Sequence, residues 1–361
     1  MDSLVSLTRA TLPSFLVPFV TLSHQVSPPE HTDSFPNSSY HDIGRLDVCL
    51  IVTLIAAMAV ARDATRLFVL EPFARWKLMR DWRRYKTQKS SNTSGASTPT
   101  TAKASPIDGA PLNGNGYLAE KSNAERLLEK TTEPRHIKHG VMRFAEQGWV
   151  FVYYLAQWSY GLYIYSNLPS DSWTGYPHIP LAAPVKLYYL WEIAFYCHSV
   201  LTLNAEARRK DHWQMFTHHV ITIALMILSY AYNFTRVGCF IMFIMDSCDL
   251  ILPFAKMLRY LGYQTACDIA FVVFMLTWLY TRHYLFILVI LSTYLQAPKA
   301  IAFDWQPERG HYFTSEVHIG FLALMIPLEI LQIIWCFLIF SMAWRVVTGQ
   351  GADDPRSDDE A

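Results

Sequence analysis

Charge is scarce in this chain of 361 residues: 17% of them are Asp, Glu, Lys or Arg, whereas 52% are hydrophobic. Soluble domains carry about 25% charged residues, so this deficit excludes an ordinary water-soluble protein. The apolar residues gather in long blocks. A block of about 20 apolar residues is long enough to cross the hydrocarbon of a bilayer. The composition therefore predicts a membrane protein with several spans.

Motifs of common cofactor sites are also missing. The six cysteines occur singly in apolar segments, without a CxxC pair, which excludes a disulfide framework and a zinc site. The chain has no P-loop, GxGxxG or GxSxG motif. A membrane di-iron centre needs several histidine-rich boxes, and this sequence has one His-His pair. We therefore predict no metal site, no cofactor and no binding of nucleic acid.

Seven apolar stretches predict the fold class, an all-α polytopic bundle of about seven transmembrane helices. The stretches cover residues 46–70, 144–165, 185–203, 215–232, 237–258, 269–295 and 318–347. The chain then divides into a lumenal N-terminal segment (1–45), a first transmembrane helix (46–70), a basic and disordered cytosolic linker (71–137), a six-helix catalytic bundle (138–348) and an acidic cytosolic tail (349–361). Within the linker, residues from about 87 to 134 are assigned to disorder because their Ser, Thr, Gly, Pro and Asn content cannot offset the entropy of ordering.

Basic residues indicate the orientation of the bundle. They crowd after the first span, between the third and fourth spans, and at the ends of the fifth and seventh, whereas the alternate loops hold few. Under the positive-inside rule the crowded loops are cytosolic, so the N-terminus is lumenal and the C-terminus cytosolic. Asn37, in the sequence Asn-Ser-Ser, is then a candidate for lumenal glycosylation, whereas Asn233, in Asn-Phe-Thr, lies too close to the membrane.

Four titratable residues lie inside the fourth and fifth spans: His218, His219, Asp246 and Asp249. An Asp at mid-membrane costs about 2.5–3.5 kcal/mol on insertion scales, so such residues are functional candidates by default. The two spans form a hairpin turning near residue 233, which places the histidine pair level with Asp249, and Asp246 lies one turn away on the same helix face. The adjacent histidines point about 100° apart and cannot have the same role. A histidine here can move a proton or accept an acyl group, and a carboxylate can orient it.

Weaker candidates surround this constellation. Glu192 and His198 in the third span are candidate substrate-binding residues, and Arg282, His283 and Glu329 could line the same cavity. Arg208, Arg209 and Lys210 at the cytosolic mouth either set the topology or steer an anionic, phosphate-bearing substrate toward His218. The alternative for every polar residue within a span is a hydrogen bond that joins two helices.

The run RRKDHWQMFTHHV, followed by MDSCDLILP at a fixed distance, resembles the signature region of ceramide synthases, the longevity-assurance branch of the TLC-domain family. The resemblance extends from about residue 140 to 347 and is strongest over residues 206–260. It implies a TLC-type helix bundle that encloses an apolar tunnel for an acyl chain. The loop at about residues 296–316 lies in the region that tunes chain length in such enzymes. The low-complexity linker, in place of a homeodomain-like insert, makes the chain most similar to fungal members.

The resemblance implies an endoplasmic reticulum enzyme that transfers a fatty acyl group from acyl-CoA to the amine of a sphingoid base. His218, His219, Asp246 and Asp249 are the expected catalytic residues, and acyl-CoA is a co-substrate, without further cofactors. The expected partners are acyl-CoA, the sphingoid base and membrane lipid. The resemblance leaves open whether the chain forms a homodimer or a heterodimer, or binds a small accessory subunit. Two alternatives are a non-enzymatic protein for lipid sensing or membrane-protein biogenesis, and a transporter with a proton relay.

Overall fold

A computed structural model describes residues 12–29, 32, 34–94, 134–205 and 211–348, and these residues are overwhelmingly helical. The expected all-α class is confirmed. The long elements are α3 (Asp47–Thr65), π-helix η1 (Arg66–Leu70), α4 (Glu71–Ser94), α6 (Arg135–Asn167), α7 (Ala183–Ala205), α8 (His212–Ala231), α9 (Thr235–Tyr260), α10 (Gln264–Trp278), π-helix η2 (Leu279–Leu285), α11 (Phe286–Leu295) and α13 (Ser315–Val347). The short ones are α2 (Val17–Val20), β1 (Gln25–Val26), β2 (Tyr40–His41), β3 (Leu181–Ala182), α12 (Ala297–Ala300) and the 3₁₀ turn η3 (Pro307–Arg309).

Each of the seven expected spans coincides with a helix or a continuous run of helices. Among the described residues, five helical stretches are long and apolar enough to cross a membrane: Asp47–Gln88, His212–Ala231, Thr235–Tyr260, Gln264–Ala300 and Ser315–Arg345. Helices α6 and α7 are rich in tyrosine and tryptophan, and α7 carries the buried polar residues Lys186, Glu192 and His198. The multi-pass architecture is thus clear, and the total of about seven spans stays a prediction for α6 and α7.

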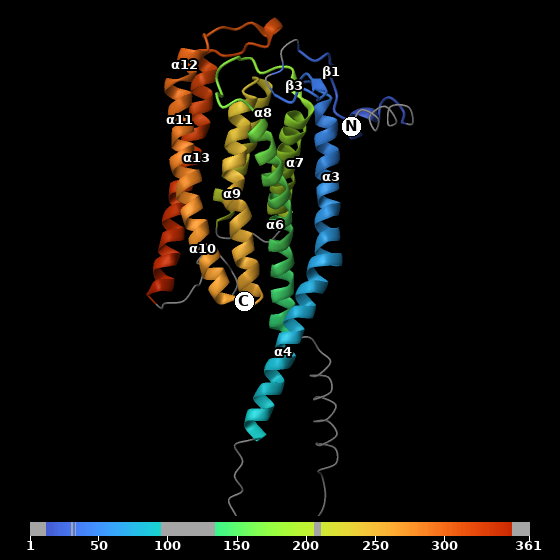
Figure 1. Cartoon of the computed structure of the whole chain (residues 1–361), viewed down its shortest axis with the longest axis vertical. Helices are drawn as coiled ribbons and strands as arrows, with labels where there is room; N and C mark the ends of the chain where they lie inside the picture. Colours follow the sequence, from blue (N-terminus) through green and yellow to red (C-terminus); the bar gives the residue numbers. More distant parts are fainter. Residues whose placement is uncertain (1–11, 30–31, 33, 95–133, 206–210, 349–361) are drawn as a thin grey trace, which may run out of the picture.

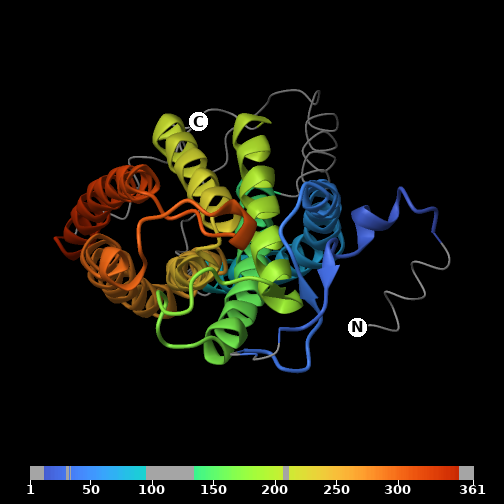
Figure 2. The ribbon, with the colours of Figure 1, turned by 90° about the horizontal axis from the view of Figure 1, so that it is seen from above.

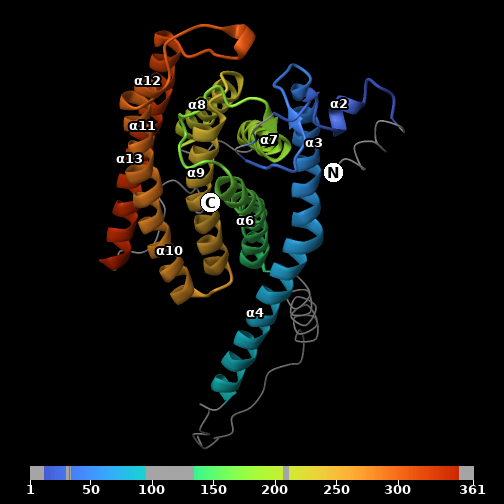
Figure 3. The same ribbon diagram turned by 45° about the horizontal axis from the view of Figure 1, so that its top comes forward.

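The long helices run side by side as a bundle (Figures 1 and 3). Seen from above in Figure 2, α3 stands at one side, the α10–α11 and α13 helices at the other, and α6 to α9 lie between them. Helix α9 packs most extensively on α6 and also contacts α10, whereas α8 contacts both α7 and α13. This arrangement surrounds α8 and α9, which carry the histidines and aspartates, with helices that can contribute further polar groups.

A buried ion pair fastens the N-terminal segment to the end of the bundle drawn at the top of Figure 1. The Lys186 ammonium lies 2.7 Å from the Asp47 carboxylate, and both side chains are almost completely buried. The same ammonium donates to the carbonyl oxygens of Ser23 and Asp42, and the Tyr230 hydroxyl donates to Asp47. Strands β1, β2 and β3 pair antiparallel beside this network. Two-residue strands carry no detectable period, so the sequence does not predict this sheet.

Helices occupy both ends of the 71–137 segment, and the expected disorder is wrong for residues 87–94. Helix α3 continues through η1 into α4 as far as Ser94, and α6 already begins at Arg135. Apolar side chains of α4, including Leu78 and Trp82, pack against a cluster that contains Ile137 and Val141 of α6. This packing stabilises a helix that the sequence assigns to the linker. Residues 95–133 and the acidic tail 349–361 lie outside the described residues.

Candidate active site

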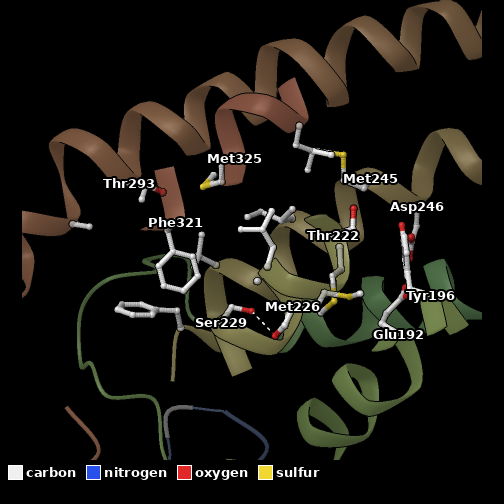
Figure 4. Close-up of a pocket in the computed structure, with 18 of the residues that line it drawn as sticks. Glu192, Tyr196, Thr222, Met226, Ser229, Met245, Asp246, Thr293, Phe321 and Met325 are labelled. Atoms are coloured by element: carbon white, nitrogen blue, oxygen red, sulfur yellow. Dashed lines mark hydrogen bonds between the residues drawn. The ribbon is translucent and has the colours of Figure 1, made fainter. Parts of the chain in front are cut away.

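An elongated pocket runs through the bundle between α7, α8, α9, α11 and α13, with about 920 Å³ of space, part of it open to the outside. Its wall is largely aliphatic and aromatic, with residues such as Leu225, Ile241 and Met325 along its length. Both carboxyl groups of the lining lie at one end, whereas Thr293 and Phe321 lie toward the other (Figure 4), and His318 bonds the Thr293 carbonyl oxygen there. The polar end is lined by Glu192, Tyr196, His218, Asp246 and Arg282. An apolar pocket with a polar end suits a long-chain molecule with a reactive head group.

His218 of α8 stands at the polar end and is buried, with 8% of its surface exposed. Its ring meets the Trp335 ring of α13 edge-on at 5.2 Å. The Nδ1 atom of His218 makes no hydrogen bond to any described residue. His218 is therefore held by packing, and its Nδ1 is not committed to a neighbouring side chain.

His219 has a different environment, as the 100° between adjacent helical positions predicts. Its Nδ1 donates a hydrogen bond to the Met215 carbonyl oxygen at 2.6 Å, and its ring lies 5.6 Å from the Tyr196 ring. Because a carbonyl oxygen only accepts hydrogen bonds, Nδ1 carries the proton of this imidazole. His218 lines the pocket, whereas His219 does not. The position of His219 allows it to hold the neighbouring Tyr196 and His218 in place.

Asp246 of α9 faces Glu192 of α7 across the polar end, beside Tyr196 (Figure 4). Both carboxyl groups are almost fully buried, with 1% and 0% of each residue exposed. Glu192 accepts a hydrogen bond of 3.4 Å from the Tyr153 hydroxyl. No N–H or O–H donor of the described residues bonds either oxygen of Asp246 or the second oxygen of Glu192, so the two carboxyl groups bond each other through a shared proton. This pair is the most unusual feature of the pocket.

Asp249 forms an ion pair with Arg282, whereas the sequence suggests a histidine as its partner. The guanidinium Nη2 lies 2.9 Å from the Asp249 carboxylate and donates to the Met245 carbonyl oxygen at 2.9 Å. Arg282 belongs to the π-helix η2 and is 3% exposed. A π-turn shifts side chains around the helix axis relative to a regular α-helix, and such turns are frequent at functional sites. The next residue, His283, faces α13 and donates to Glu329 at 2.7 Å.

The remaining predicted residues divide into three groups. Glu192 lies in the pocket, as predicted. His198 is buried on the side of α7 that faces α3, near Arg62 and Asp63, and does not line the pocket. Arg208, Arg209 and Lys210 lie outside the described residues.

The sequence pattern does not single out Tyr196, which lines the pocket, or Gln332 and Trp335, which contact the pocket-lining residues Met245 and His218. It gives only a weak indication of Arg282. Gln332 is fully buried and its amide approaches the Met245 sulfur at 3.8 Å. An Arg-His dipeptide within an apolar stretch is the available signal for Arg282. Tyrosine and tryptophan are so abundant at the ends of membrane helices that no pattern distinguishes the two aromatic residues that meet the histidines.

Comparison with known families gives a match to the TLC domain over residues 143–341. The chain belongs to the TLC-domain family. The matched region extends from α6 into α13 and contains the whole pocket. The TLC domain also explains why α6 and α7, although they are not among the five clearly apolar stretches, belong to the same bundle.

Individual relatives narrow the comparison within the TLC-domain family. The sphingosine N-acyltransferase lag1 of Schizosaccharomyces pombe is 42% identical over 228 residues, which cover 61% of this chain and 58% of the relative. The ceramide synthase FUM18 of Gibberella moniliformis is 34% identical over 252 residues, 61% of this chain and 59% of the relative. Human ceramide synthase 5 is 33% identical over 225 residues, which cover 61% of this chain and 55% of the relative. The chain thus spans less than two thirds of the length of these curated relatives.

Proposed function

We propose that this chain is a ceramide synthase, which transfers a fatty acyl group from acyl-CoA to the amine of a sphingoid base. The observation that carries the proposal is the position of His218 at the polar end of a long apolar pocket, within a TLC domain. The relatives named as sphingosine N-acyltransferase or ceramide synthase support the same reaction. A sphingoid base and a fatty acyl chain are both long apolar molecules with one polar head, which is the shape and polarity of this pocket.

His218 lies near the end of α8 that we expect to face the cytosol, which fits delivery of acyl-CoA from the cytosol. His218 is six residues from the start of α8, about 9 Å along the helix axis. With the N-terminus lumenal, that end of α8 is cytosolic, so the thioester reaches His218 from the cytosolic face while the acyl tail extends along the apolar wall. In this proposal Arg208, Arg209 and Lys210, which precede α8 in the sequence, attract the CoA phosphates. The enzyme then lies in the endoplasmic reticulum membrane with its C-terminus in the cytosol.

Amide formation requires a neutral amine, a group that accepts a proton and a site that excludes water, because hydrolysis of the thioester competes. His218 can act in two ways. In the first, the imidazole attacks the thioester, CoA thiolate leaves, and the acyl-imidazole passes its acyl group to the amine. In the second, the imidazole takes a proton from the amine while the amine attacks the thioester directly. In both, Arg282, held by Asp249, is the cation that can balance the developing oxyanion.

The test uses membranes from cells that lack their own ceramide synthases and express this chain. Sphinganine and a panel of C16 to C26 acyl-CoAs are supplied to wild type, His218→Ala and Asp268→Asn. Asp268 is an exposed carboxylate of α10 and serves as the control. Ceramide from wild type and the control, but not from His218→Ala, supports the proposal. Unchanged product from His218→Ala contradicts the catalytic assignment, and no product from well-expressed wild type favours the alternative of a non-enzymatic TLC protein.

A further inference from the structure

The facing carboxyl groups of Glu192 and Asp246 are not explained by acyl transfer to or from His218. They come from different helices, α7 and α9, and converge on the same end of the pocket. Buried polar atoms are nearly always hydrogen-bonded, yet no N–H or O–H donor of the described residues bonds either Asp246 oxygen or the second Glu192 oxygen. These oxygens of the two carboxyl groups bond only each other, through a shared proton. Facing carboxyl oxygens without a donor beyond that proton indicate a ligand that brings hydrogen-bond donors and positive charge.

A hydrogen bond that only joins α7 to α9 does not account for the facing carboxyl groups of Glu192 and Asp246. Two carboxylates side by side repel each other, so at rest the pair is stable only when it holds one proton between its members. Its net charge is then one negative unit. The nearest cation, Arg282, is already paired with Asp249 at 2.9 Å. The charge of the carboxyl pair is therefore left without a protein counter-ion in contact with it among the described residues.

We propose that Glu192 and Asp246 form the binding site for the ammonium head group of the sphingoid base. This inference rests on the proposed function and names the part of the pocket that the amine substrate occupies. An ammonium group has three N–H donors and one positive charge, which matches two facing carboxylates once it displaces the proton that they share. His218 lines the same end of the pocket, so an amine bound here lies beside the group that handles the acyl chain.

Every proton is accounted for when the ammonium binds and the amide forms. The ammonium replaces the proton that the two carboxyl groups share, and that proton leaves to solvent, so the two carboxylates and the bound ammonium together keep one net negative charge. The bound ammonium then returns one proton to the pair, which regenerates the resting carboxyl pair and leaves a neutral amine. In direct attack, the amine nitrogen forms its C–N bond as the C–S bond of the thioester breaks. In the acyl-imidazole route the C–S bond has already broken, and the bond between the acyl carbon and His218 breaks as the amide forms. The second proton of the nitrogen passes through His218 to the CoA sulfur, and the products are the amide and CoA thiol.

The experiment separates the two substrates. In Glu192→Gln the side chain keeps its shape but loses its charge, so we expect the KM for sphinganine to rise about tenfold or more, as for loss of a hydrogen bond to a charged group. The KM for acyl-CoA should change less than about twofold. Glu192→Asp restores the charge with a shorter reach and should give an intermediate KM for sphinganine. Asp268→Asn, which removes an exposed carboxylate outside the pocket, is the matched control.

The outcomes distinguish the ammonium site from the reaction itself. An unchanged KM for sphinganine in Glu192→Gln overturns the ammonium site, as does an equal rise in both KM values. If Glu192→Gln makes no ceramide, binding of radiolabelled sphinganine to the purified protein decides the matter: lost binding supports the site and retained binding overturns it. Wild type that makes no ceramide at all rejects the proposed function itself, so the two failures are distinguishable.

Discussion

Arg282 and Asp249 form an ion pair of 2.9 Å between η2 and α9, at the edge of the polar end of the pocket. The arginine is 3% exposed, whereas the aspartate side chain is 30% exposed. A nearly buried guanidinium needs a counter-charge to stay in a membrane-spanning bundle. The second Asp of the Asp-x-x-Asp face therefore serves the arginine, and only the first, Asp246, is directed at the pocket.

Removal of the Asp249 charge should destabilise the protein and lower its activity. In Asp249→Asn the Arg282 charge is left buried and unpaired, at a cost of about 1–3 kcal/mol; this is less than for a fully buried pair because Asp249 is partly exposed. The double variant Asp249→Leu/Arg282→Met should recover stability but not activity. Thermal unfolding in detergent and ceramide synthesis measure the two effects. Equal stability of wild type and Asp249→Asn would show that the pair contributes nothing.

The two adjacent histidines should differ sharply. His218→Ala should lower kcat about 10²- to 10⁴-fold, the usual contribution of a catalytic acid or base, because it removes the pocket-lining imidazole. His219→Ala should lower kcat about tenfold, through the loss of a supporting ring beside Tyr196. Steady-state kinetics on membranes with matched protein amounts test this order. The reverse order would exchange the roles assigned to the two residues.

Intact-protein mass spectrometry distinguishes the two routes of acyl transfer. If His218 accepts the acyl group, wild type incubated with acyl-CoA but without sphingoid base should gain the mass of one acyl group. His218→Ala should not gain it, whereas His219→Ala should. Wild type without an adduct, under conditions in which one turnover is complete, favours direct attack of the amine with His218 as the base.

A bulky residue in the middle of the pocket should shorten the preferred acyl chain. Met325 of α13 lines the pocket and is 3% exposed, so Met325→Trp narrows the apolar channel. We expect the ratio of long-chain to short-chain ceramides to fall about tenfold, because overpacking in a close-packed interior costs about 1–3 kcal/mol. Ile330→Trp, on an exposed position of the same helix, is the control and should leave the ratio unchanged. Ceramide profiling after mixed acyl-CoA supply reads out the ratio.

Glycosylation tests both the orientation and the local structure. Asn37 is exposed in the N-terminal segment, whereas Asn233 is 3% exposed and donates through Nδ2 to the Gly310 carbonyl oxygen at 2.7 Å. Asn37→Gln should therefore abolish a mobility shift on endoglycosidase treatment, and Asn233→Gln should have no effect on it. A cytosolic location of Asn37 would contradict the proposed topology, whereas a glycan on Asn233 would contradict its buried position.

The sequence alone determines the features that depend on local composition. Apolar blocks of about 20 residues predict membrane helices for two reasons. Side chains that face the hydrocarbon of the bilayer must be apolar, and every backbone N–H and C=O group must be hydrogen-bonded within its own helix. Titratable residues are rare in such blocks, and this rarity is enough to make His218 and Asp246 functional candidates. The α3–η1–α4 helix cannot be predicted in this way because its second half is stabilised by packing on α6, which composition does not report.

Only the tertiary structure decided which polar residues meet. Glu192 is 54 positions from Asp246 in sequence, since 246 − 192 = 54, and whether the two face each other depends on the rotation and crossing of α7 and α9. His198, six residues after Glu192 on the same helix, faces α3 instead of the pocket. Likewise the π-turn at η2 turns Arg282 toward Asp249 and His283 toward Glu329. Hydrophobic length is a local property of the chain, whereas the partners of a buried charge are set by how helices far apart in the sequence pack together.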